Sequence, residues 1–192
     1  MEYFNQVINK EMIDHDQLEA HSFEQCTFSH HHFDFTVINC CDFIECTFEH
    51  CTFNSIKTDG VKVRDCTFEH CHLIGITWSD FARKNLLFSP IEKMKHCYLK
   101  YNYFDDLSFI KMDFSNNDIH YCEFRDCNLN DANFTNCDLQ ETLFVNNELL
   151  RTDFRQSEGM ILNLQQNHIK GTKFSSFSAP QLLHDSFDLY ID

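Results

Sequence analysis

The sequence predicts an all-β solenoid, a chain wound into a coil that turns a corner every five residues. Three observations lead to this prediction. A five-residue unit, with a small residue first and a large apolar residue at its centre, repeats along most of the 192 residues. A period of five fits neither the 3.6 residues of a helical turn nor the two of a strand. The chain contains 21 Phe but only 4 Gly and 2 Pro, too few turn-forming residues for an all-β fold built on hairpins.

The first block of repeats covers residues 18–78 and follows an expected N-terminal cap at residues 1–17. Its centres recur every five residues from Leu18 to Trp78, and Thr58 is the one centre that is not a large apolar residue. A coil with a corner in each unit buries two residues in every five. The residue two positions before each centre is therefore also predicted to point inward.

Ten of the eleven cysteines lie two residues before a centre, as Cys41, Cys46 and Cys51 do, and Cys40 alone does not. The sequence has no C-x-x-C pair, so the spacing favours neither a zinc site nor a redox motif. Thiols at the inward position are predicted to be reduced and to act as compact apolar fillers of the core.

The unit resembles that of the pentapeptide-repeat family, which has a small residue first, Asp or Asn second, and Leu or Phe at the centre. Asp113-Phe114, Asn133-Phe134 and Asp153-Phe154 match this pattern closely, and the match extends over about 18–78 and 97–156. The resemblance implies a right-handed quadrilateral β-helix with four units, or twenty residues, in each coil. Neighbouring coils are then expected to lie about 4.8 Å apart.

A twenty-residue coil predicts columns of phenylalanines along the axis of the solenoid. These core ladders are expected to consist of Phe28, Phe48 and Phe68; of Phe104, Phe124 and Phe144; and of Phe114, Phe134 and Phe154. Such ladders fill the interior, which removes the cavity that an active site usually needs.

The repeat breaks at residues 79–96, and a second block, shifted by one residue in phase, follows at residues 97–175. We expect the break to form a bulged coil or a projecting loop. Residues 176–192 are predicted to contain a short helix, with Ser178 as its N-cap and a proline in its first turn. An alternating strand that begins at Phe187 is expected to end the chain.

The sequence offers little for catalysis, since it has no nucleophile elbow, phosphate loop or H-E-x-x-H motif. We therefore expect neither catalytic residues nor a cofactor, and a binding protein instead of an enzyme. His30, His50 and His70 fall in one outward column that could bind zinc or nickel. Surface histidine columns arise easily when repeats duplicate, so no functional metal is expected.

The net charge of −15 argues against nucleic acid and anionic membranes as partners and favours a basic one. Spread over a rod of about 38 Å, the height of about eight coils, it amounts to about one charge per 2.5 Å, against about 1.7 Å for duplex DNA. An acidic surface also serves simply to keep a rod soluble. The first residues show no signal peptide and no stretch is long and apolar enough to span a membrane, so a cytoplasmic location is expected.

The broken mid-chain coil, with the run from Asn167 to Leu183, is similar to the quinolone-resistance (Qnr-type) proteins and the microcin B17 immunity protein. That resemblance implies a DNA-mimicking homodimer, joined through its C-terminus, that binds DNA gyrase or topoisomerase IV and protects it from quinolone or toxin poisons. The implied dimer contact consists of Leu182, Leu183, Phe187, Leu189 and Ile191. The implied partner loop consists of Phe81, Arg83, Lys84, Leu86, Phe88, Ile91 and Lys95. The alternative is a structural or interaction scaffold with an unrelated protein partner.

Overall fold

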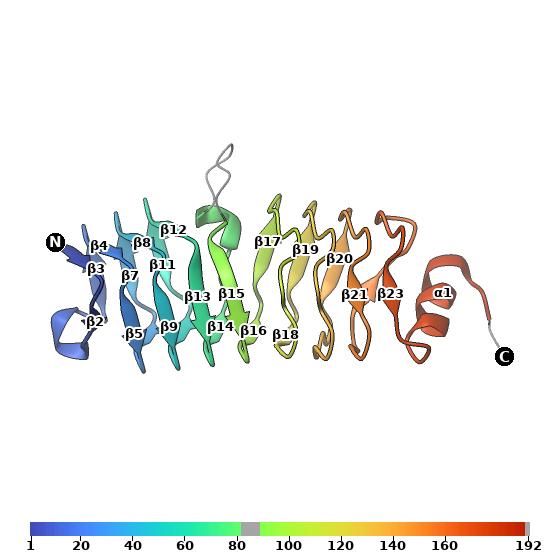
Figure 1. Ribbon diagram of the computed structural model, residues 1–192, viewed down its shortest axis with the longest axis horizontal. Helices are drawn as coiled ribbons and strands as arrows, with labels where there is room; N and C mark the ends of the chain where they lie inside the picture. Colours follow the sequence, from blue (N-terminus) through green and yellow to red (C-terminus); the bar gives the residue numbers. More distant parts are fainter. Residues whose placement is uncertain (82–88, 191–192) are drawn as a thin grey trace.

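The structure, a computed structural model, describes residues 1–81 and 89–190 as one elongated solenoid with its two ends far apart (Figure 1). The chain winds through about eight coils, and strands of neighbouring coils pair in parallel. The α-helix α1 (Ala179–Phe187) closes the C-terminal end. The all-β solenoid predicted from the repeat is therefore confirmed.

Short strands form the walls of the solenoid, and we name the walls of the first block faces A to D. Face A contains β1 (Glu2–Phe4), β4 (Ser22–Glu24), β8 (Asp42–Ile44) and β12 (Lys62–Arg64). Face B contains β2 (Val7–Ile8), β5 (Thr27–Ser29), β9 (Thr47–Glu49), β13 (Cys66–Glu69) and β15 (Ile91–Lys95). Face C contains β6 (His32–Asp34), β10 (Thr52–Asn54), β14 (His72–Ile74), β16 (Tyr98–Lys100) and β18 (Asp118–His120). Face D contains β3 (Gln17–Glu19), β7 (Val37–Asn39) and β11 (Lys57–Asp59).

The second block adds two more sheets to these walls. One contains β17 (Tyr103–Asp105), β19 (Glu123–Arg125), β20 (Leu143–Val145) and β22 (Ile161–Leu162), and the other contains β21 (Asp153–Phe154) and β23 (Lys173–Phe174). Two short 3-10 helices, η1 (Lys10–Met12) and η2 (Trp78–Phe81), complete the described elements.

The corners between faces explain how the chain turns with so few glycines. One non-glycine residue at each of many corners has a left-handed backbone, with φ of 50° at Cys40, 51° at His50 and 57° at Tyr101. That conformation costs roughly 1–2 kcal/mol per residue. The same corner amide donates a hydrogen bond to the next coil, as the His50 N–H does to the Glu69 carbonyl at 2.9 Å. Corner residues thus replace hairpin turns.

The core consists of stacked aromatic columns, and the structure places all nine predicted phenylalanines in the three expected ladders. Ring centroids of Phe104 and Phe124 lie 4.4 Å apart, and those of Phe124 and Phe144 lie 5.1 Å apart, with interplanar angles of 4° and 2°. Neighbouring columns meet edge to face, as Phe124 and Phe134 do at 87°. Both arrangements are favourable for aromatic pairs, so each ring is held from several sides.

The inward residue before each centre does more than fill space. The thiol of Cys46 donates to the Phe23 carbonyl of the preceding coil at 3.4 Å, and that of Cys127 donates to the Phe104 carbonyl at 3.2 Å. The Asn147 amide makes the equivalent bond to the Phe124 carbonyl at 2.8 Å. The interpretation of these thiols as apolar fillers is therefore incomplete, because they also satisfy buried carbonyl groups.

Thiol accessibility gives a direct test of this core. The ten cysteines at the inward position are buried and Cys40 is exposed, and all eleven are free. Burial raises the pKa of Cys122, Cys127 and Cys137 to about 12. Since the thiolate is the reactive form, we expect one thiol per chain to react with Ellman's reagent in native protein and eleven in denaturant. Cys40→Ser should abolish the native reaction, and rapid labelling of a second thiol would contradict this packing.

The chain regains its register after the break. Leu73 on β14 pairs with Leu99 on β16, 26 residues later instead of the usual 20, so this coil carries six extra residues. β15 rejoins face B next to β13 with a register shift after Cys66. The projecting part of the break is therefore shorter than residues 79–96.

The end of the chain differs from the prediction. A helix is present with Ser178 as its N-cap, but it runs through Phe187, which the sequence analysis assigned to a strand. Asp188 ends the helix in a left-handed conformation with φ of 54°, and Tyr190 packs edge-on against His184 at 4.7 Å. Residues 188–190 form no strand, so that prediction is wrong there.

Candidate partner-binding surfaces

The predicted partner loop lies only partly on the surface. Arg83, Lys84, Leu86 and Phe88 lie outside the described residues. Ile91 is buried in the core, which corrects its assignment to a partner-contact loop. The reason is that β15 resumes the repeat at this residue.

The two remaining residues of that prediction border the break. Phe81 is half-buried and packs edge-on against the buried Trp78 at 6.1 Å. The indole N–H of Trp78 donates to the Asn102 side chain at 3.0 Å, which fixes its ring. Lys95 is exposed and pairs with Glu69 at 3.5 Å. Phe81 and Lys95 are therefore the described residues of the predicted loop that a partner could reach.

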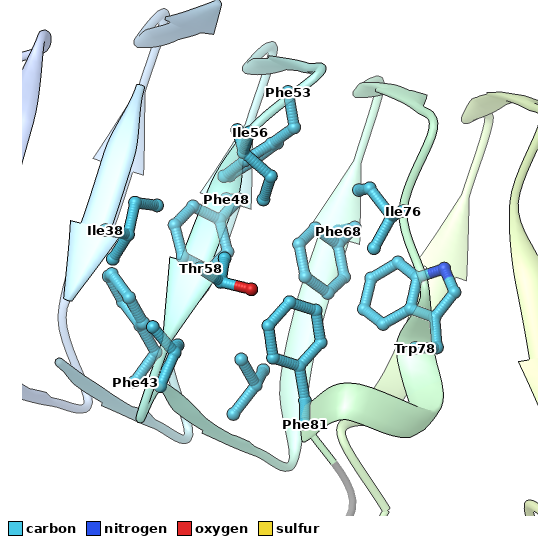
Figure 2. A pocket seen from close by; sticks show the side chains of 12 residues that line it. Ile38, Phe43, Phe48, Phe53, Ile56, Thr58, Phe68, Ile76, Trp78 and Phe81 are labelled. Carbon is cyan, nitrogen blue, oxygen red and sulfur yellow. The ribbon is translucent and has the colours of Figure 1, made fainter. Parts of the chain in front are cut away.

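An apolar pocket lies beneath the break, where the wall of the solenoid is interrupted (Figure 2). Its cavity volume is about 40 Å³, far below the roughly 300–1,000 Å³ of ligand pockets. It is lined by Ile38, Phe43, Phe48, Phe53, Ile56, Thr58, Val61, Val63, Phe68, Ile76, Trp78 and Phe81. Thr58 occupies a centre where the repeat has a large apolar residue, and its hydroxyl points into the pocket (Figure 2). We interpret the pocket as a packing defect.

Filling this defect should stabilise the protein. Thr58→Ile replaces a hydroxyl in apolar surroundings and adds a methyl group, so we expect the free energy of unfolding to rise by about 1–2 kcal/mol. Chemical denaturation measures the change. Thr67→Ile is the matched control, because Thr67 alternates with the inward Cys66 and Phe68 on β13. A lower midpoint for Thr58→Ile would mean that the pocket has no room for the added atoms.

The outward histidine column is longer than the sequence suggested. Ring centroids of His30, His50, His70 and His96 follow one another at 4.9, 4.9 and 5.1 Å. The rings stack nearly parallel, and because their nitrogen lone pairs lie in the ring planes, they do not converge on one point. Across residues 1–81 and 89–190, no group of three or more His, Cys, Asp or Glu side chains is placed to hold a metal ion.

The C-terminal end separates the predicted dimer residues into two groups. Leu182 is 5% exposed and lies in the core, and Leu183 is half-buried against it. The Leu164 N–H donates to the Ser186 hydroxyl at 2.9 Å and ties α1 to the last coil. Leu182 therefore covers the end of the solenoid within one chain, which corrects its assignment to a dimer contact.

Other side chains at this end are free to meet a second chain. Phe187 is 45% exposed and Leu189 is also exposed. Phe177 and Tyr190, which the sequence analysis did not single out, are exposed beside them. Ile191 lies outside the described residues.

The acidic residues form a column on the second block. Asp118, Asp138 and Glu158 occupy matching positions on three successive coils. Asp138 accepts a contact from His120 at 2.9 Å, whereas within the described part of the chain Asp118 and Glu158 have no cationic partner. Other carboxylates are paired, as Asp131 is with Arg151 at 2.6 Å. Like charges at neighbouring positions destabilise a sheet, so this column is an expensive feature of the surface.

Comparisons with known proteins identify the repeat. Residues 122–158 match the family model for pentapeptide repeats, with eight copies. A search of the curated proteins found no significant match. Within the described residues, α1 is too short and too polar to serve as a membrane-spanning helix, and no other helix is a candidate.

Solved structures give two informative reports of similarity in chain course. A trypsin-treated variant of QnrB1, a plasmid-mediated fluoroquinolone resistance protein, is 16% identical with a TM-score of 0.43, covering 100% of this chain and 98% of that one. HetL, a pentapeptide repeat protein involved in heterocyst differentiation regulation from the cyanobacterium Nostoc sp. Strain PCC 7120, is 12% identical with a TM-score of 0.46, covering 91% of this chain and 84% of that one. At these values the likenesses support no conclusion about function.

Proposed function

The chain belongs to the pentapeptide-repeat family, and from this premise we propose that it is a DNA-mimicking protein that binds a type II topoisomerase. In this proposal it engages DNA gyrase or topoisomerase IV and protects the enzyme from quinolone or toxin poisons. The partner surface is the enzyme's basic DNA-binding surface.

The observation that supports this proposal most is the arrangement of negative charge on a rigid rod. The net charge is −15, and Asp118, Asp138 and Glu158 repeat on successive coils. Coils lie about 4.8 Å apart, and phosphates along one DNA strand lie about 3.4 Å apart. The column thus presents regularly spaced negative charge on a scale similar to that of a DNA strand.

The filled interior supports a binding role over catalysis. Aromatic ladders such as Phe114, Phe134 and Phe154 occupy the centre of the solenoid. The apolar pocket beneath the break has a volume of about 40 Å³ and no polar side chain other than Thr58. Function is therefore sought on the outer surface.

A gyrase supercoiling assay with ciprofloxacin, run with and without the protein, tests the proposal. We expect the protein to restore supercoiling in the presence of the drug. The triple variant Asp118→Asn, Asp138→Asn and Glu158→Gln should lose this effect. Its matched control carries Gln in place of Glu2, Glu11 and Glu19, which changes the net charge equally at the other end of the rod.

No rescue at any concentration, with gyrase and with topoisomerase IV, would contradict the proposal. An interaction scaffold with an unrelated partner is the alternative, and a pull-down from cell extract separates the two. Recovery of topoisomerase subunits supports the proposal, and recovery of a different protein alone supports the alternative.

A further inference from the structure

Four of the six tyrosines lie close together beside the acidic column. They are Tyr98 on β16, Tyr103 on β17, and Tyr101 and Tyr121 at the corner between those strands' faces on two successive coils. Tyr101 is 46% exposed and Tyr121 is 40% exposed. Tyr103 bridges Thr77, so the group also borders the break in the repeat.

The exposed rings are held in place by one another and by a lysine. The centroids of Tyr101 and Tyr121 lie 5.5 Å apart. The Lys100 Nζ lies 5.0 Å from the first centroid and 5.4 Å from the second. Tyr98 packs edge-on against His120 at 5.3 Å. Because the rings are already ordered, binding through them costs little side-chain entropy.

The fold does not require aromatic residues at these positions. Ser55 and Gly75 occupy the same corner on the two preceding coils, with φ of 52° and 71°. Both serve the turn without a ring. The tyrosines are thus additions to the surface, and tyrosine is among the residues most enriched in protein interfaces.

The acidic column begins where the tyrosines end. Tyr98 pairs in register with Asp118, and Asp138 and Glu158 follow on the next two coils. The surface therefore offers ring faces next to carboxylates. A guanidinium group suits both, because it stacks on an aromatic face and donates two parallel hydrogen bonds to a carboxylate. An ammonium group cannot make the second kind of contact in the same planar way.

We propose that this tyrosine–carboxylate surface, formed by Tyr98, Tyr101, Tyr121, Asp118, Asp138 and Glu158, binds arginine side chains of a basic protein partner. The inference deepens the proposed function, on which it rests for the identity of the partner as a type II topoisomerase. The preference for arginine over lysine follows from the surface alone.

Two variants test the surface. Tyr101→Ser with Tyr121→Ser removes the two corner rings, and Ser55 shows that serine fits this corner. Phe35→Ser is the matched control, because Phe35 occupies the same corner column three coils away, with φ of 58° and 71% exposure. Circular dichroism and the thermal midpoint establish that both variants fold.

Binding is measured with two synthetic peptides, one of alternating arginine and glycine and one of alternating lysine and glycine. The wild type and Phe35→Ser should bind the arginine peptide about tenfold more tightly than the lysine peptide. The double tyrosine variant should bind both about equally. Asp118→Asn with Glu158→Gln should weaken both peptides, which tests the surface independently of the rings.

The same proteins are then titrated with gyrase and with topoisomerase IV. A loss of affinity in the double tyrosine variant, with normal binding by Phe35→Ser, supports the inference. Wild-type affinity in the double variant would overturn it and leave the proposed function intact. If no protein binds either enzyme but the arginine preference depends on the tyrosines, the proposed function fails and the inference stands. Equal binding of the two peptides by the wild type overturns the inference.

Discussion

Phe124→Ala is expected to lower the free energy of unfolding by about 3–5 kcal/mol. Phe124 is fully buried, stacks between Phe104 and Phe144, and meets Phe134 edge to face. Removing the ring leaves a cavity that stacked coils cannot close, because their spacing is fixed by main-chain hydrogen bonds. Chemical denaturation monitored by circular dichroism measures the loss.

Phe35→Ala is the control for this experiment, because it removes the same atoms from an exposed corner. Its effect should stay within about 0.5 kcal/mol. A loss below about 1 kcal/mol for Phe124→Ala would contradict the tightly stacked ladder, since even a partly collapsed core site costs more.

Leu182→Asp and Phe187→Asp are expected to act differently, although both were predicted to disrupt a dimer. Leu182 is 5% exposed against the last coil, so an aspartate there buries an unpaired charge and should cost about 3 kcal/mol or more. Phe187 is 45% exposed, so its replacement should leave the fold intact.

Thermal unfolding and analytical ultracentrifugation separate these effects. If the chains pair end to end through the exposed residues near α1, Phe187→Asp should yield a folded monomer with an unchanged thermal midpoint. Leu182→Asp should instead lower the midpoint. A dimer that persists in Phe187→Asp would show that the chains pair elsewhere, or through the neighbouring Phe177 and Leu189.

The repeat allowed the sequence to predict the solenoid and the three phenylalanine ladders. A period of five fixes which residues face inward, so burial could be derived from spacing alone. The position of Cys40 outside this spacing also predicted its exposure. The hydrogen bonds of the other thiols could not be predicted, because spacing does not reveal which carbonyl of the preceding coil is within reach.

The errors fall where the repeat stops. Six extra residues in one coil shift the phase, so Ile91 was assigned to a loop and His96 was not recognised as the next member of the histidine column. At the C-terminus, apolar residues were assigned to a dimer contact, whereas Leu182 lies over the open end of the last coil. Sequence alone does not distinguish an apolar residue that covers its own chain from one that meets another.

The surface tyrosines were missed for a different reason. They lie at outward positions, where the repeat accepts almost any residue, so the pattern gave them no role. Their significance comes from clustering on two adjacent coils and from their register with Asp118, which became visible only when the coils were stacked.

Competition with DNA tests the central claim most directly. A fluorescent DNA duplex is bound to gyrase or topoisomerase IV, and unlabelled protein is added while fluorescence anisotropy is recorded. An acidic rod that occupies the DNA-binding surface should displace the duplex completely, with an apparent duplex affinity that falls in proportion to the protein concentration. Duplex that stays bound with unchanged affinity at a saturating concentration of the protein would contradict DNA mimicry.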